Sequence, residues 1–174
     1  MNTNYFGCRD DMWFKRVSIL KSIRVLICGI EKNGITILDR TIATVTEQPF
    51  TWFPNNPTKE NLTVEAFKQL LQNGNSSWRK LVVYRDPVER FLSAYQSKCL
   101  MRDGDGRTHC HAHFDLNETD ISIENVAKRL LLKGYNNPHW APQTSFCEGT
   151  VGTMWESYTH HVLFDDLSKI VDVF

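Results

Sequence analysis

Short, continuous apolar runs alternate along the chain with segments in which apolar residues recur every three or four positions. The runs at Arg24–Ile30, Leu81–Tyr84 and Tyr158–Phe164 are typical of strands buried on both faces, as in a parallel sheet. The periodic segments between them predict helices. Strands that alternate with helices predict an α/β fold, in which a parallel sheet is flanked by helices.

The predicted helices carry local start signals. Thr63 and Ser122 can each cap a helix, and Pro87 suits a first helical turn. We expect helices over residues 35–45, 63–74, 87–95 and 122–134, with a last one beginning at Asp165. We expect these apolar residues to face inward: Ile35, Leu38, Ile42, Phe67, Leu70, Leu71, Val88, Phe91, Leu92, Tyr95, Ile123, Val126 and Leu130. The polar stretches 48–61 and 101–120 are predicted to be loops.

Length and charge narrow the class of protein. The 174 residues are 41% hydrophobic and 23% charged, which fits one globular domain spanning residues 1–174. Lys plus Arg number 20 and Asp plus Glu number 20, so no overall positive field points to a nucleic-acid partner. No stretch approaches the roughly 20 apolar residues of a membrane span. Any anion site must therefore be built locally.

The five cysteines leave at least one thiol outside any set of pairs. Cys28 lies in an apolar run, so we expect it to be a buried free thiol. Glycosylation sequons begin at Asn61, Asn75 and Asn117, which modestly favours a glycoprotein of the secretory pathway.

The turn after the first predicted strand has the features of a phosphate cradle. It reads Lys32-Asn33-Gly34-Ile35-Thr36 and leads into a predicted helix, whose N-terminus offers N–H groups and a partial positive charge. Gly34 lets the backbone approach an anion, Lys32 adds a charge and Thr36 a hydroxyl. The pattern differs from the ATP and GTP loop, because Lys32 precedes Gly34. A surface turn with a lysine is the alternative.

A second candidate follows the strand at 81–84. Arg85 stands at the carboxyl end of that strand, where α/β folds bind ligands, and a guanidinium is suited to forked hydrogen bonding of phosphate. Ser93 could reach the same anion from the following helix. Taken alone, the better interpretation is an exposed salt bridge among Arg85, Asp86, Glu89 and Arg90.

Together these segments resemble the carbohydrate sulfotransferases, the group with the chondroitin 4-sulfotransferase and HNK-1 sulfotransferase enzymes. Residues 85–95, Arg-Asp-Pro-Val-Glu-Arg-Phe-Leu-Ser-Ala-Tyr, are similar to the family's 3′-phosphate motif. Lys32, Gly34, Thr36 and Arg40 fall in register with its 5′-phosphosulfate motif. Residues 139–143, His-Trp-Ala-Pro-Gln, with Cys147 behind them, are similar to its H-W-x-P segment. The resemblance runs from about residue 24 to residue 167.

The resemblance implies a P-loop NTPase-like fold of the sulfotransferase type and a single sulfotransferase domain. It implies transfer of a sulfuryl group from 3′-phosphoadenosine 5′-phosphosulfate to a hydroxyl of a glycan, glycoprotein or proteoglycan, with no metal required. The donor would be bound by these residues: Lys32, Asn33, Gly34, Ile35, Thr36, Arg40, Arg85 and Ser93. Lys32 would also be catalytic. The resemblance also implies a location in the Golgi lumen or secretory pathway, with membrane attachment only through an anchor outside this sequence.

Some positions depart from the family pattern. Glu31 replaces a proline and sets an acid beside the anion, and Ile35 replaces serine or cysteine, leaving only its backbone N–H. The family usually continues beyond the position of Phe174, so we expect a domain truncated at its ends or an unusually small one. By resemblance, Cys99 and Cys147 belong to disulfides, with Cys110 the best third candidate.

The acceptor hydroxyl needs a general base, for which His139 is the first candidate and Glu31 the second. A structural histidine beside Trp140 is an equal alternative for His139. The histidines around Cys110 could hold zinc, but an acceptor-binding loop fits that polar stretch better. The alternatives to an active sulfotransferase are an inactive carbohydrate- or nucleotide-binding homologue and a P-loop small-molecule kinase.

Overall fold

The computed structural model describes residues 16–51, 63–74, 77–101, 109–133 and 137–174. The chain divides into two compact units, which are described separately below. Among the described residues, 16–85 and 142–174 form the sheet unit, and 86–141 form the helical unit. The expectation of one sulfotransferase domain over residues 1–174 stays a prediction.

The sheet unit is built on four strands in the order β1-β2-β3-β4, with bounds Val17–Leu20, Val25–Cys28, Arg79–Tyr84 and His160–Leu163. Strands β2, β3 and β4 are parallel, with Leu81 opposite both Ile27 and His160. This confirms the predicted α/β fold with a mainly parallel sheet. Strand β1 pairs antiparallel with β2 and was not predicted.

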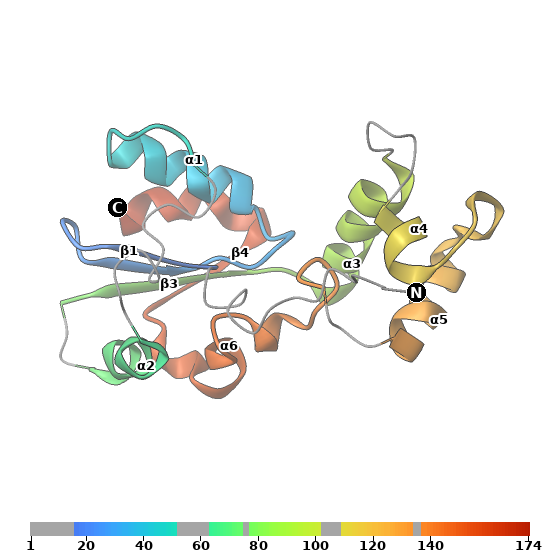
Figure 1. Ribbon diagram of the computed structural model, residues 1–174. Coiled ribbons are helices and arrows are strands. Elements are labelled where there is room, and N and C mark those ends of the chain that lie inside the picture. Colours follow the sequence, from blue (N-terminus) through green and yellow to red (C-terminus); the bar gives the residue numbers. More distant parts are fainter. Residues whose placement is uncertain (1–15, 52–62, 75–76, 102–108, 134–136) are drawn as a thin grey trace. The chain divides into compact units, whose positions relative to one another are not determined.

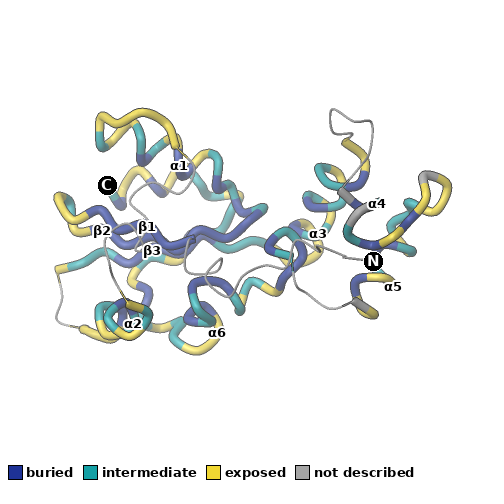
Figure 2. Tube along the Cα trace, in the orientation of Figure 1, coloured by how far each residue is buried: buried dark blue, intermediate teal, exposed yellow. Residues whose placement is uncertain are grey.

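Helices cover both faces of this sheet (Figure 1). Helix α1 (Ile35–Val45) and the kinked 3-10 helix η8 (Phe164–Val173) lie on one face, and α2 (Val64–Gln72) and α6 (Thr150–Thr153) lie on the other. Short 3-10 turns, η6 (Gln143–Ser145) and η7 (Trp155–Ser157), flank α6. Strands β1 and β2 are buried throughout and β3 is buried except at its ends, whereas β4 buries only Val162; the outer sides of the helices are exposed (Figure 2).

The core between the sheet and the α1 and η8 layer follows the predicted pattern. Alternate strand residues meet the buried stripe of α1 and the apolar side of η8, and the cluster comprises Leu20, Val25, Ile27, Leu38, Ile42, Leu81, Val83, Val162, Ile170 and Val173. Thr63 caps α2 as expected, accepting a hydrogen bond from the Ala66 N–H. None of the helices in the described ranges has the length and apolar character needed to cross a membrane.

The helical unit contains α3 (Pro87–Tyr95), a π turn η4 (Gln96–Leu100), α4 (His109–Phe114), η5 (Glu118–Asp120) and α5 (Ile123–Lys133). The predicted loop over residues 101–120 is wrong where α4 and η5 form. The predicted inner face of α3 is also wrong in part, because Val88 is 65% exposed and Leu92 is 39% exposed. Instead α3 buries Arg90 and Ala94, since Arg90 finds carbonyl partners inside the unit.

Two disulfides correct the interpretation of the cysteines. Cys28 is buried as predicted, but it is bonded to Cys147 and is not a free thiol. Cys99 is bonded to Cys110, so the three cysteines expected to be in bridges are all in bridges. The apolar run correctly indicated burial but could not show the partner of Cys28, because Cys147 is 119 positions away and meets it only in the folded sheet unit. Cys8 lies outside the described residues.

His160 at the start of β4 should make stability sensitive to acid. Burial lowers its pKa from the usual 6.5, and the charges of Arg79 and His161 lower it further. As the pH is lowered, the unfolded chain therefore binds a proton at His160 before the folded protein does. The free energy of unfolding should thus fall as the pH falls through about 6.5. Urea titrations at pH values from 8 to 5 should show that the free energy of unfolding falls less steeply with pH in His160→Asn than in wild type. The same dependence on pH in the two proteins would contradict this.

Candidate functional site

The cradle predicted from the sequence forms at the carboxyl end of β2. Strand β2 ends at Cys28, a short loop follows, and α1 begins at Ile35 with Gly34 as its N-cap. Gly34 has φ 76°, and a Cβ atom there would lie 2.9 Å from Leu167 Cδ1 and 3.2 Å from Phe164 Cε2. Both the left-handed backbone and the close packing against η8 therefore require glycine at this position.

The first turn of α1 presents N–H groups suited to an anion. The Ile37 and Leu38 N–H groups donate to the Gly34 carbonyl, whereas no backbone carbonyl among the described residues accepts from Ile35 or Thr36. The first turn contains no acidic residue, so the positive end of the helix dipole is not neutralised there. This helix end can therefore bind a phosphate or sulfate group.

The side chains predicted for the cradle take different positions along α1. Ile35 is buried and Thr36 half-buried, while Arg40, four positions after Thr36 and so on the same side of the helix, is exposed. The Ile35 side chain packs over Gly29, where an added Cβ would lie 2.6 Å from Ile35 Cδ1. Ile35 can thus offer a ligand only its N–H, as expected, whereas Thr36 and Arg40 can offer side chains.

Glu31 is nearly buried and is not an uncompensated acid beside the anion. Its Oε1 lies 2.9 Å from Nη2 of Arg16, and the two side chains are only 12% and 10% exposed. A nearly buried ion pair of this kind compensates the charge that replaces the family's proline. Arg16 precedes β1, a strand that the sequence pattern does not predict, so this partner of Glu31 was not predicted either.

Lys32 and Arg85 come together although 53 positions separate them. Arg85 follows the end of β3, and its Nη1 donates a 3.4 Å hydrogen bond to the Lys32 carbonyl. The Arg85 guanidinium also lies 4.2 Å from the centre of the Phe164 ring. Lys32 itself has φ 69°, a left-handed conformation that is costly for a residue with a side chain. The structure therefore places two cationic residues at the carboxyl ends of adjacent parallel strands.

Asn33 has a structural role that the sequence did not show. It is fully buried, and its Nδ2 donates to the Val83 carbonyl at 3.0 Å and to Gln143 Oε1 at 2.6 Å. Its side chain is thus engaged inside the protein, and the expectation that Asn33 contacts the donor can apply only to its backbone. Gln143 also bonds to the backbone of Arg85 and was the main residue missed.

Ser93 and His139 belong to the helical unit. Ser93 is half-buried on α3, and the His139 N–H donates to Asn137 Oδ1 at 2.9 Å. Buried Arg90 fixes the turn around His139, because it donates to the carbonyls of Pro138 and Ala141 at 3.0 and 2.7 Å. The exposed salt bridge proposed as the alternative for Arg85 and Arg90 is therefore wrong for Arg90. A shared site of Ser93 or His139 with Lys32 and Arg85 stays a prediction.

The zinc alternative loses its sulfur ligand. Cys110 is bonded to Cys99, so its thiolate is not available to a metal. Within the described ranges, no group of three or more His, Cys, Asp or Glu side chains is arranged to hold a metal ion.

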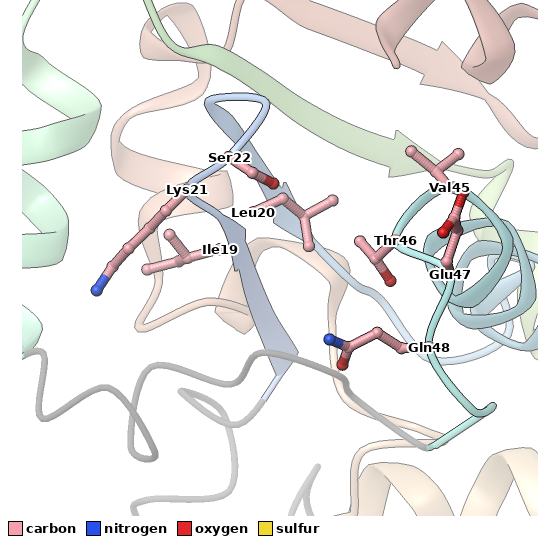
Figure 3. Close-up of a pocket in the computed structure, with 8 residues that line it drawn as sticks. All are labelled: Ile19, Leu20, Lys21, Ser22, Val45, Thr46, Glu47 and Gln48. Carbon is pink, nitrogen blue, oxygen red and sulfur yellow. The ribbon is translucent and has the colours of Figure 1, made fainter.

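A groove of about 360 Å³ lies at the far end of α1 from the cradle (Figure 3). It is lined by Ile19–Ser22, where β1 ends, and by Val45–Gln48, where α1 ends. None of the predicted site residues lines it. The groove is therefore separate from the candidate site, which lies at the N-terminal end of α1.

Comparison with known proteins identifies the family of the chain. An uncharacterised protein of Caenorhabditis elegans is 26% identical over 128 residues, which cover 68% of this chain and 35% of that protein. The chain thus matches about a third of the length of this curated relative. No solved structure matches the chain. The sequence model of the sulfotransferase family matches residues 15–173, nearly the whole sequence, and the chain therefore belongs to the sulfotransferase family.

Proposed function

We propose that this domain transfers a sulfuryl group from 3′-phosphoadenosine 5′-phosphosulfate to a carbohydrate hydroxyl. The observation that carries the proposal is that a helix N-terminus and an arginine, both suited to anions, lie together at one edge of the sheet. The N-terminal end of α1 follows β2, and Arg85 follows β3 and bonds to the loop that carries Lys32. A donor with phosphate groups at two ends matches two such elements, and the carboxyl edge of parallel strands is where α/β folds bind ligands.

The residues proposed to bind the donor fit its charge. In the proposal, Lys32, Thr36 and the N–H groups of Gly34, Ile35 and Thr36 bind the 5′-phosphosulfate, with Arg40 one turn further along. Arg85 binds the 3′-phosphate together with Ser93. Lys32 stabilises the charge that develops on the leaving phosphate oxygen, which is the largest electrostatic demand of sulfuryl transfer.

The acceptor hydroxyl requires a base. His139 remains the candidate, because its backbone is fixed by Asn137 and Arg90 while an imidazole can take a proton near neutral pH. Glu31 is a weaker candidate, because its carboxylate is engaged with Arg16. We propose a glycan, glycoprotein or proteoglycan as the acceptor.

The disulfides support a Golgi-lumen or secretory location for this activity. Four of the five cysteines are in bridges, and disulfides persist mainly in oxidising compartments. The donor site needs no metal in this proposal, since Lys32, Arg85 and the helix end supply the positive charge.

The first test is binding of the desulfated product, 3′-phosphoadenosine 5′-phosphate. Calorimetry should show the same affinity with magnesium and with a chelator, because the site uses cationic side chains and backbone N–H groups. Strict dependence on magnesium would favour the kinase alternative. A radiolabelled-sulfate transfer screen over a panel of glycans then separates an enzyme from an inactive homologue, which would bind the nucleotide and transfer nothing.

Replacing Arg85 by alanine should mainly raise the donor KM. A contact to the 3′-phosphate is far from the reacting sulfur, so it is equally strong in the ground state and the transition state. Loss of a charged hydrogen-bonding group costs on the order of 2–3 kcal/mol, or roughly 30- to 150-fold in affinity. The matched control is Arg129→Ala, on an exposed position of α5. A fall in kcat with an unchanged KM would contradict this role.

A further inference from the structure

Gln143 joins the two anion-binding elements of the sheet unit through a single side-chain amide. Its Oε1 accepts from the Arg85 N–H at 3.0 Å, and its Nε2 donates to the Arg85 carbonyl at 2.7 Å. Because a backbone N–H can only donate and a carbonyl can only accept, these two bonds also fix which amide atom is oxygen. The side chain thus pairs with Arg85 as a neighbouring strand would, just beyond the end of β3.

The same oxygen also reaches the cradle. Gln143 Oε1 accepts a second hydrogen bond, from Asn33 Nδ2 at 2.6 Å. Asn33 lies between Lys32 and Gly34 and is fully buried, and its other amide proton goes to the Val83 carbonyl. Both of its N–H donors are therefore used to tie the cradle loop to Gln143 and to β3.

We propose that Gln143 is a positioning residue that sets the spacing between the cradle of α1 and Arg85. This inference rests on the proposed function. With its backbone fixed by Gln143, Arg85 keeps its guanidinium over Phe164 and against the Lys32 carbonyl. A ligand with two phosphate groups needs both elements at one distance, whereas a ligand with one phosphate needs only one element. Pre-arranged spacing therefore favours the two-phosphate ligand alone.

The surroundings of Gln143 allow its replacement without loss of the fold. The segment that follows is held by the Cys28–Cys147 disulfide and by hydrogen bonds of Thr150 to the Cys147 carbonyl and to the Tyr158 hydroxyl. The Gln143 side chain is half-buried and lies outside the apolar core. A change of its amide thus removes specific hydrogen bonds and leaves the packing of the sheet in place.

The experiment compares two probes on folded protein. Calorimetry measures 3′-phosphoadenosine 5′-phosphate, which has two phosphates, and adenosine 5′-phosphate, which has only the 5′ group. Gln143→Ala should bind the first about 10-fold more weakly and the second within about 2-fold of wild type, as expected for the loss of shared positioning hydrogen bonds. Gln69→Ala, which removes an exposed glutamine of α2, is the matched control and should change neither.

Two further readouts separate positioning from general loosening. In an Arg85→Ala background, Gln143→Ala should weaken binding of the two-phosphate probe by less than about 2-fold more, because the guanidinium that Gln143 positions is already gone, although its backbone partners remain. Hydrogen exchange at the Arg85 amide should be faster in Gln143→Ala than in wild type, since its acceptor is removed. Gln143→Glu keeps an acceptor for the Arg85 and Asn33 donors but loses the bond to the Arg85 carbonyl, so its affinity should be intermediate.

Each result is decisive. Wild-type protein that does not bind the two-phosphate probe overturns both the proposed function and this inference. If wild type binds it and Gln143→Ala weakens both probes equally, or neither, only the inference is overturned. Unchanged exchange at the Arg85 amide, or full additivity with Arg85→Ala, would also overturn it. Selective loss of the two-phosphate probe with non-additivity supports it.

Discussion

Replacing Lys32 by alanine is expected to lower kcat on the order of 100-fold or more, while the desulfated nucleotide still binds measurably. In the proposed reaction Lys32 meets charge that grows on the leaving phosphate oxygen as the sulfur–oxygen bond breaks. An interaction that strengthens in the transition state lowers the barrier more than it stabilises the bound ground state. Steady-state kinetics on a responsive glycan and calorimetry with the product nucleotide measure the two quantities separately.

The backbone of the cradle makes alanine the informative replacement at this position. Lys32 has φ 69°, and alanine meets much the same steric cost there as lysine does. Glycine would relieve that cost and so would change the loop together with the charge. The Lys32 carbonyl, which accepts from Arg85, is retained in either variant. Lys32→Ala therefore tests mainly the ammonium group.

Lys169→Ala is the matched control, because Lys169 is exposed on η8 and its ion pair with Asp166 is on the surface. It should keep wild-type kcat and KM. If Lys32→Ala kept kcat and raised only KM, Lys32 would bind the donor without taking part in the chemistry. An unchanged kcat and KM would remove Lys32 from the site altogether.

The elements predicted correctly are those whose signals are local. The apolar run at β2, the glycine of the following turn and the stripe of Leu38 and Ile42 lie within 20 residues and define a strand, a loop and a helix. Strand β1 was missed because Val17–Leu20 is four residues long and contains a polar Ser18, so it has neither a long apolar run nor a clear alternation. It forms because β2 offers it an edge.

The helical unit shows a different limit of sequence patterns. α4 lies in a stretch of His and Cys that has no helical stripe, and the bond from Cys110 to Cys99 stabilises it from outside. In α3 the periodicity pointed to Val88 and Leu92, yet the charged Arg90 is buried, because two backbone carbonyls satisfy its guanidinium. Such pairing of a buried charge cannot be read from the spacing of residues within one helix.

In the candidate site, too, the features with local sequence signals could be predicted and those that depend on distant residues could not. The cradle around Gly34 could be predicted, because its chemistry depends on neighbours in the sequence. Gln143 could not, since its partners Arg85 and Asn33 are 58 and 110 positions away. The compensation of Glu31 by Arg16 likewise depends on how β1 pairs with β2. Sequence patterns thus predicted the groups that would contact a ligand, which stay predictions, and the structure adds the residues that hold these groups in place.

Removing the Cys28–Cys147 bridge is expected to lower the free energy of unfolding by about 5 kcal/mol. The bridge closes a loop of 119 positions, and in the chain-entropy account a cross-link restricts the unfolded chain more as its loop lengthens. The bridge from Cys99 to Cys110 closes only 11 positions, for which the same relation gives about 3 kcal/mol. All four cysteines are buried, so alanine replaces cysteine in a similar environment in both cases.

The test is urea unfolding of wild type and of two double variants, Cys28→Ala with Cys147→Ala and Cys99→Ala with Cys110→Ala. The first variant should lose more stability than the second, and an equal loss would contradict the dependence on loop length.

The Cys28–Cys147 bridge has a second consequence, which concerns the candidate site. Cys147, Glu148 and Gly149 are consecutive left-handed residues with φ 53°, 59° and 72°, a run that costs roughly 1–2 kcal/mol for each residue that is not glycine.

This run begins four positions after Gln143, and its anchors include the bridge to β2, the hydrogen bonds of Thr150 and the bond from the Gly149 N–H to the Ser145 carbonyl. Without the bridge the left-handed run can relax, and Gln143 loses part of the support that aims its amide at Arg85. The variant lacking Cys28 and Cys147 should therefore bind 3′-phosphoadenosine 5′-phosphate several-fold more weakly even where it is fully folded. Wild-type affinity in this folded variant would show that the bridge stabilises the sheet unit without positioning its site.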